Sequence, residues 1–241
     1  MSSRQPQSPT SINPIPTSEP NSHPPLQRAG GFAAATEAIT YLIGIALFAA
    51  YLVPQGFYDS VDDPAQTMDF MLDHQIVLYV WTVAIYLLAA AALVVLVLAL
   101  SERLRPSTPG LAQTAGAFGL IWAGVLFVSG MIALVGQSAV AELAAADRER
   151  AISVWASVSV IHDATGGGIE IVGAIWVALI ALAGWRSRAL PRGLSVLGAV
   201  VAVAGTLTLV PALADIGAVF GIGFIVWFLW VARVLLRPAH R

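Results

Sequence analysis

The chain contains no cysteine and no lysine among its 241 residues. The absence of cysteine excludes disulfide bonds, thiolate metal ligands, cysteine nucleophiles and iron–sulfur clusters, because each requires the cysteine sulfur. In the absence of lysine, all 12 basic side chains are arginines, and the net charge is −2. A nucleic-acid-binding surface needs clustered basic residues to neutralise phosphates, so this composition argues against a nucleic-acid partner.

Charged residues are scarce: they form 11% of the chain, whereas apolar residues form 58%. Soluble domains typically carry about 25% charged residues. Crossing roughly 30 Å of hydrocarbon takes about 20 apolar residues, and unbroken apolar runs lack the alternation of a membrane β-barrel. The sequence therefore predicts an all-α integral membrane bundle of six transmembrane helices embedded in a lipid bilayer. The six apolar segments are 32–53, 76–100, 113–136, 164–185, 193–212 and 216–236.

The arginines divide unequally between the two sides of such a bundle. Two of them, Arg148 and Arg150, lie on one side, and ten lie on the other: Arg4, Arg28, Arg103, Arg105, Arg186, Arg188, Arg192, Arg233, Arg237 and Arg241. Cytoplasmic loops carry the excess of positive charge. This pattern predicts that both termini are cytoplasmic and that the protein is a multi-pass protein of the bacterial plasma (inner) membrane.

The first thirty residues differ from the rest of the chain. They hold seven of the 14 prolines, together with many Ser and Gln residues. Such a segment buries too little apolar surface to offset the entropy of ordering. We therefore expect a disordered cytoplasmic tail over residues 1–30, followed by one six-helix transmembrane domain over residues 31–237.

The fourth apolar region is too long for a single crossing. Ala151 to Trp185 is a run of 35 residues without proline, which as one helix would measure about 52 Å. Gly166, Gly167 and Gly168 lie in its middle, and glycine weakens a helix by roughly 0.5–1 kcal/mol per residue relative to alanine. We expect a short helix over about 147–163, a bend near the glycines and then the membrane span.

Ionisable residues cluster around this bend. His162 and Asp163 precede the glycines and Glu170 follows them, and topology places Asp73 and His74 in the same outer half. Ionisable groups inside a membrane cost about 2.5–3.5 kcal/mol on insertion scales and are functional candidates for that reason. We expect these five residues to line a polar recess that opens to the outer face.

Three interpretations of this cluster stay open at the level of sequence. It is a hydrogen-bonded polar patch beside a bent helix, a proton or ion site, or a metal site, which includes a b-type haem between His74 and His162. The chain has no HExxH motif and no histidine pair with ligand spacing on one helix. The sequence thus predicts no cofactor and no catalytic residue.

Glu37 lies inside the first span and allows two interpretations. Either Tyr41 or Thr40, about one turn further on, is the hydrogen-bond partner of its carboxylate, or Glu37 belongs to a proton relay. Small residues add a further alternative, because the GxxxG pair Gly217 and Gly221 suits close helix packing within one chain or in a homodimer.

These features favour a non-enzymatic membrane protein of unknown activity, either a small transporter or a subunit that binds a membrane protein partner. The alternative is a membrane-embedded metal- or haem-dependent enzyme that uses the outer His, Asp and Glu residues. Two segments carry a resemblance: Arg28-Ala-Gly-Gly before the first span, and WRSRALPRGLSVLG at Trp185–Gly198 between the fourth and fifth. With six spans, the chain resembles a family of uncharacterised bacterial six-helix membrane proteins classed as a domain of unknown function. The resemblance implies fold and membrane location, and no functional residues.

Overall fold

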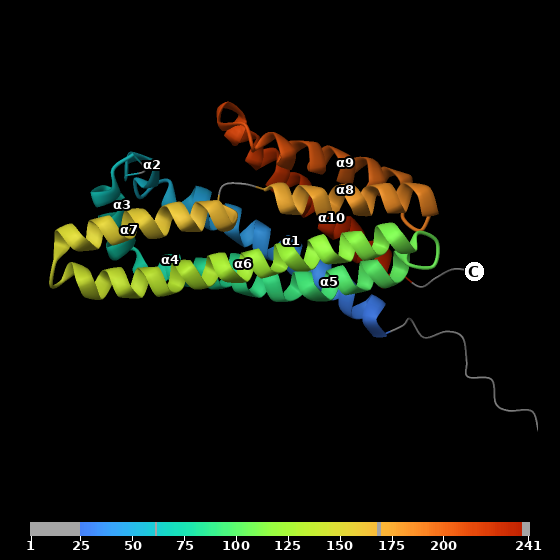
Figure 1. Ribbon diagram of the computed structural model, residues 1–241, viewed down its shortest axis with the longest axis horizontal. Helices are drawn as coiled ribbons and strands as arrows, with labels where there is room; N and C mark the ends of the chain where they lie inside the picture. Colours follow the sequence, from blue (N-terminus) through green and yellow to red (C-terminus); the bar gives the residue numbers. More distant parts are fainter. Residues whose placement is uncertain (1–24, 61, 168–169, 238–241) are drawn as a thin grey trace, which may run out of the picture.

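The computed structural model describes residues 25–60, 62–167 and 170–237, which form helices and turns without a β-strand (Figure 1). The α-helices are α1 (Pro25–Leu47), α2 (Phe57–Ser60), α3 (Pro64–Asp73), α4 (Gln75–Thr82), α5 (Ala89–Leu104), α6 (Pro109–Ala144), α7 (Arg148–His162), α8 (Ile171–Ser187), α9 (Arg192–Leu207) and α10 (Gly217–Leu236). Three π-helical turns are η1 (Phe48–Leu52), η2 (Val83–Leu88) and η3 (Asp163–Gly167), and a 3₁₀ turn, η4, covers Pro211–Ile216. The all-α class expected from the sequence is confirmed.

Four helical segments are long and apolar enough to cross a membrane: Pro25–Leu52, Gln75–Leu104, Pro109–Ala144 and Gly217–Leu236. The remaining two apolar helices, α8 with 17 residues and α9 with 16, are shorter than expected. The fourth apolar segment was expected to begin at 164, but α8 begins only at Ile171, because the chain first passes through η3 and the break that follows it. The protein is thus a helical membrane protein, and its described residues contain four long apolar helices and two shorter ones.

Helix α6 divides the molecule into two regions. Its 36 residues measure about 54 Å, well beyond the roughly 30 Å of a hydrocarbon core. Helix α8 packs along one half of α6, and α7 packs along the other half (Figure 1). We call the half that contains α8 the bundle and the half that contains α7, α2 and α3 the cap.

The bundle is a ring of helices around an aromatic centre. Each helix contacts the next in the order α1, α5, α6, α8, α9 and α10, and α10 contacts α1 again. Phe224 on α10 lies at the centre, in aromatic contact with Trp122 and Trp176. Glycines receive these large rings: a Cβ on Gly119 would lie 2.6 Å from the Trp176 Nε1 atom. In the bundle, large aromatic side chains therefore pack against glycines, which have no side chain.

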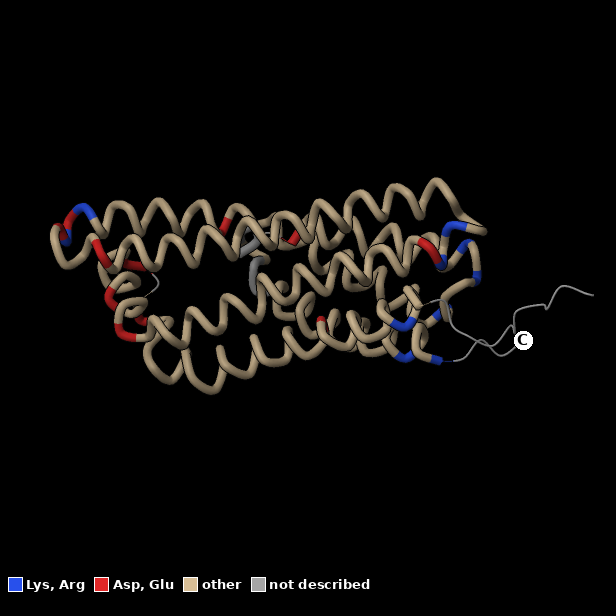
Figure 2. Tube along the Cα trace, turned by 90° about the horizontal axis from the view of Figure 1, so that it is seen from below, with Lys and Arg blue, Asp and Glu red and all other residues tan. Residues whose placement is uncertain are grey.

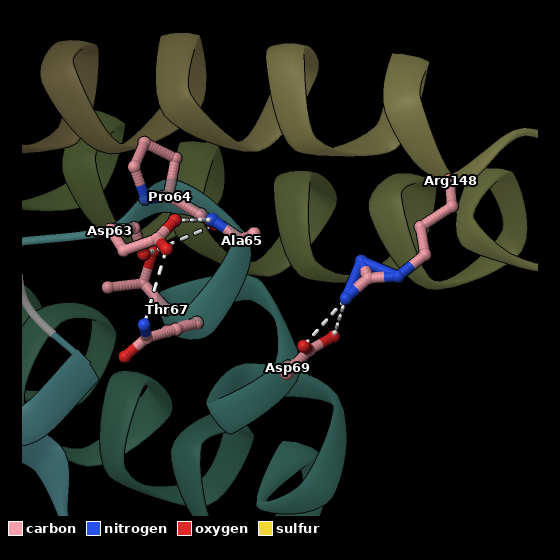
Figure 3. A network of polar contacts seen from close by, with 7 residues as sticks. Asp63, Pro64, Ala65, Thr67, Asp69 and Arg148 are labelled. Atoms are coloured by element: carbon pink, nitrogen blue, oxygen red, sulfur yellow. Dashed lines mark hydrogen bonds and ion pairs between the residues drawn. The ribbon is translucent and has the colours of Figure 1, made fainter.

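The cap has a separate, smaller core and many paired polar groups. Its buried side chains are Leu52, Met68, Met71, Leu78, Val140 and Ala151. Asp63 caps α3 by accepting a hydrogen bond from the Ala65 N–H at 2.8 Å, and both carboxylate oxygens of Asp69 accept from Arg148, at 3.1 and 2.7 Å (Figure 3). The cap therefore has the polar pairing of a water-exposed domain.

Charge separates along the long axis of the molecule. Figure 2 shows basic residues gathered at one end, and acidic residues with one small basic group at the opposite end. The basic end holds the start of α1 and the end of α10, and the opposite end holds the turn between α6 and α7 with Arg148 and Arg150. For the ten arginines in the described residues, the division predicted from the sequence is therefore a division between two ends of the fold.

Helix α1 begins at Pro25, six residues before the expected start of the membrane domain. Gln27 explains the early start, because it is buried and its Nε2 donates to the Ala99 carbonyl oxygen at 2.9 Å. The rest of the expected disordered tail, residues 1–24, lies outside the described residues.

Candidate functional site

The expected interruption of the fourth apolar region is present. Helix α7 ends at His162, η3 follows to Gly167, and α8 begins at Ile171, with residues 168–169 outside the described part. An interruption frees backbone groups that need partners when they lie at membrane depth. The carbonyl oxygen of His162 accepts hydrogen bonds from the Ser129 hydroxyl at 3.4 Å and the Thr165 hydroxyl at 3.1 Å. Hydroxyl groups therefore stabilise the end of α7.

Thr208 stabilises the other side of the interruption. The Glu170 backbone N–H donates to the Thr208 Oγ1 at 3.2 Å, and this hydroxyl donates in turn to the Gly205 carbonyl oxygen at 2.7 Å. Thr208 is buried at the end of α9. The sequence gives no reason to expect this role of Thr208, because a threonine at the end of an apolar segment carries no signal until α9 is known to pack against α8.

A pocket of about 410 Å³ lies beside the interruption, and Glu170 forms part of its wall. Several of its other walls are aromatic, including Tyr41 from α1 and Trp81 from α4. The described residues that line it are Tyr41, Gly44, Ile45, Phe48, Trp81, Ile85, Tyr86, Leu126, Glu170, Gly217, Ala218, Phe220, Gly221 and Ile222. The volume falls in the range of about 300–1,000 Å³ typical of small-molecule sites. We call this cavity the Glu170 pocket.

All three π-helical turns lie next to the Glu170 pocket. Phe48 of η1 and Tyr86 of η2 line it, and η3 ends three residues before Glu170. Single π turns inside α-helices widen the helix locally and occur frequently at functional sites. Their convergence shows that the regular helix geometry is disturbed at the level of the pocket in three separate segments.

Specific contacts hold the aromatic walls in place. The Trp81 Nε1 donates to the Gly44 carbonyl oxygen at 3.3 Å, which joins α4 to α1. Gly130 on α6 lets Tyr86 approach, since a Cβ at Gly130 would lie only 2.7 Å from the Tyr86 Cβ. The pocket walls are thus positioned by helix contacts that are too close for larger residues.

The pocket opens through the side of the bundle. Two of its wall residues, Ile45 on α1 and Ile222 on α10, are 39% and 57% exposed. Among the lining residues that the structure describes, Glu170 is the one acidic residue and none is basic. Within the described part of the chain, no side chain forms an ion pair or a hydrogen bond with the Glu170 carboxylate.

His162 and Asp163 lie near this pocket but do not line it. The His162 ring packs edge-on against the Tyr86 ring at a centroid distance of 5.1 Å, so Tyr86 joins His162 to the pocket. Asp163 Oδ1 lies 3.7 Å from His162 Nδ1, and the Asp163 side chain is 70% exposed. Glu170 therefore lines the pocket, and His162 and Asp163 lie beside it.

His74 and Asp73 belong to the cap instead. The His74 ring packs against Phe70 at a centroid distance of 4.4 Å, and its Nδ1 lies 3.5 Å from the Tyr51 hydroxyl. Tyr86, the contact of His162, follows His74 by 12 residues along a nearly continuous helical run, or about 18 Å. The two histidines therefore lie at different levels of the molecule. Across the described residues, no three His, Asp or Glu side chains are grouped so that they could hold a metal ion.

Glu37 is buried in the bundle, with 2% of its surface exposed. The expected pairing with Thr40 is not made by the carboxylate: the Thr40 hydroxyl donates to the backbone carbonyl oxygen of Glu37 at 2.9 Å. The Glu37 Oε1 atom has no hydrogen-bond partner among the described residues. Tyr41, one turn further on, lines the Glu170 pocket, so Tyr41 lies between this buried carboxylate and the pocket along α1.

The chain belongs to the family described as "Domain of unknown function (DUF4386)", which matches residues 37–232. The resemblance to an uncharacterised family is therefore confirmed. The matched range includes Glu37, Glu170 and the Trp185–Gly198 segment, whereas the Arg28-Ala-Gly-Gly segment precedes it. No curated protein and no solved structure matches the chain.

Proposed function

We propose that this protein is a small transporter of the bacterial plasma membrane and that the Glu170 pocket is its substrate site. In this proposal the chain crosses the membrane six times with both termini in the cytoplasm, and the cap stands on the outer side. Helices α8 and α9 are about 24–26 Å long, so with their flanking turns they reach across a hydrocarbon core of roughly 30 Å.

One observation supports this proposal: a small-molecule-sized pocket lies beside an interrupted helix, among the long apolar helices. Transporters commonly bind substrate where a membrane helix is discontinuous, because the break exposes backbone groups and allows movement. Tyr41 and Phe48 lie 13 and 20 residues beyond Arg28, or about 20–30 Å from the basic end. The pocket is therefore in the outer half of the proposed bilayer.

Reporter fusions test the topology. Fusions of alkaline phosphatase, which is active only outside the cytoplasm, are placed after residues 65, 108, 145, 189 and 241. We expect activity at 65 and 145 and none at 108, 189 and 241. Alkaline phosphatase activity at the C-terminus would overturn the six-crossing arrangement.

If the protein is a transporter, the pocket should be accessible to water from each side of the membrane in turn. The chain has no cysteine, so a single Ala218→Cys substitution in the pocket wall gives one reactive thiol. A membrane-impermeant thiosulfonate, which reacts with thiols in contact with water, is applied to right-side-out and to inverted membrane vesicles. We expect modification from both sides.

Ile39→Cys is the matched control, because Ile39 is exposed on α1 and does not line the pocket. In lipid this thiol should stay unmodified from either side. Modification of Ala218→Cys from the outer side alone would contradict the transporter proposal and support a binding subunit whose pocket stays open to one side. No modification from either side would overturn a water-accessible pocket altogether.

A further inference from the structure

The charge of the Glu170 pocket is unbalanced. The described residues of its wall contribute one carboxylate and no basic side chain. Burying an unpaired charge is costly, and proteins compensate by pairing it. Since the described residues contribute no ion-pair partner to Glu170, a ligand with a positive charge is the natural complement to this site.

The remaining wall suits the same charge. Tyr41, Phe48, Trp81, Tyr86 and Phe220 contribute aromatic rings to the pocket. The faces of aromatic rings attract organic cations, by about 2 kcal/mol or more where water is excluded. The rest of the wall consists of aliphatic side chains and glycines, which accommodate an apolar ligand body. A small inorganic cation would instead need several oxygen ligands, and a single carboxylate does not meet that need.

The position of the opening identifies the route of entry. Ile45 and Ile222 flank it on the lateral surface of the bundle, which faces lipid if α1 and α10 cross the membrane. Gly217 and Gly221 leave space on the α10 side of the pocket because they have no side chain. A Cβ on Gly221 would lie 4.0 Å from both Ile45 and Tyr41. A ligand that already resides in the outer leaflet can therefore enter between α1 and α10.

We propose that the Glu170 pocket binds an amphipathic organic cation, an amine or quaternary onium group attached to an apolar body, which enters from the outer leaflet. This inference rests on the proposed function and specifies its substrate class. The Glu170 carboxylate pairs with the cationic centre, the aromatic rings surround it, and the apolar body lies against Ile45 and Ile222.

Tetraphenylphosphonium and tetraphenylborate test this proposal, because they share a shape and differ in the sign of their charge. Binding of each ion to the purified full-length protein is measured in detergent, where no membrane potential concentrates the cation. We expect saturable binding of tetraphenylphosphonium and none of tetraphenylborate. Glu170→Gln should weaken phosphonium binding by about tenfold or more, a loss of about 1.4 kcal/mol.

Two further variants guard against effects of misfolding. Glu142→Gln removes an exposed carboxylate of the cap and should leave binding unchanged. Gly221→Leu places a side chain in the opening and should also weaken binding, although a Cβ there makes only ordinary contacts. Equal binding of both ions, or unchanged binding in Glu170→Gln, would overturn the proposed ligand class.

The two proposals fail separately. If Ala218→Cys is modified from both sides but tetraphenylphosphonium does not bind, the protein transports another class of substrate. If the cation binds and protects Ala218→Cys, but the thiol is reached from the outer side alone, the ligand class stands and transport is wrong.

Discussion

The bundle and the cap differ in how many of their polar groups are paired. In the cap, Asp69 pairs with Arg148, and the Trp155 Nε1 donates to the Thr67 hydroxyl at 3.2 Å. In the bundle, the Trp176 Nε1 and one oxygen of Glu37 are buried without a hydrogen-bond partner among the described residues. Pairing is easy to supply where water and charged side chains are near, whereas unpaired buried groups are costly. In the cap, the Gln137 Oε1 atom is also buried without a partner among the described residues. The bundle holds more such groups and therefore carries the larger share of this cost, and the Glu170 pocket lies at the border between the two regions.

Their packing differs as well. The bundle centre consists of large rings fitted against glycines, whereas the fully buried core of the cap consists of methionine and aliphatic side chains, with partly buried rings such as Phe57 and Phe70 packed around it. Ring-on-glycine packing tolerates no added atoms, while methionine adapts to irregular gaps. The comparison predicts that equivalent perturbations cost more in the bundle than in the cap.

The largest effect should follow from Phe224→Ala. The Phe224 ring makes aromatic contacts with Tyr41, Trp122, Trp176 and other rings of the bundle, and its removal should destabilise the protein by about 3–5 kcal/mol. Thermal unfolding in detergent, followed by size-exclusion chromatography, measures this effect. Val226→Ala, on the exposed face of the same helix, is the control and should change little. Equal losses in the two variants would contradict a packed aromatic centre.

Adding atoms should be the next most harmful change. Gly119→Leu drives a side chain into Val97 and Trp176, at 2.5 and 2.6 Å from the new Cβ, and should cost about 1–3 kcal/mol. Gly124 lies on the same helix with no atom within 4 Å of its Cβ position. Gly124→Leu should therefore be nearly neutral in the same thermal assay. If both variants behave alike, α6 does not pack as described.

A smaller and local effect is expected in the cap. Asp63→Ala removes the side-chain cap of α3 and should cost about 1 kcal/mol. Hydrogen exchange should accelerate in α3 and leave α8 to α10 unchanged, because the two cores are separate. Asp62→Ala, at the exposed neighbouring position, serves as the control. Faster exchange throughout the bundle would show that the two regions unfold as one unit.

The smallest effect should come from Arg148→Ala. The Arg148 and Asp69 side chains are each about half exposed, and exposed ion pairs contribute about 0–1 kcal/mol. The loss should be detectable at low ionic strength and shrink in high salt, where surface charges are screened. Arg150→Ala removes a neighbouring arginine and should show a smaller dependence on salt. A large loss that persists in high salt would mean that this pair anchors the cap.

The location of the site followed from sequence only in part. The excess length of the 151–185 region and its glycines predict the interruption that the structure shows. Glu170 lines a pocket beside it, whereas the expected polar recess that opens to the outer face stays a prediction. The expected companions of Glu170 differ from the observed ones. Tyr41 and Tyr86 reach the pocket, His162 stands behind Tyr86, and His74 packs in the cap. An expectation based on membrane depth places residues together when they lie at the same depth. Depth does not specify which face of a helix each residue occupies.

The sequence by itself determined the helical class, the apolar segments, the separation of arginines and the interruption near the glycines. These properties depend on composition, segment length and local backbone preference, which act within a few turns of one helix. The tertiary structure alone decided that α9 places Thr208 beside Glu170 and that α1, α4 and α10 enclose that carboxylate with aromatic rings. Helices that are apolar on every side carry little information about their neighbours, so close packing of rings against glycines settles which faces meet.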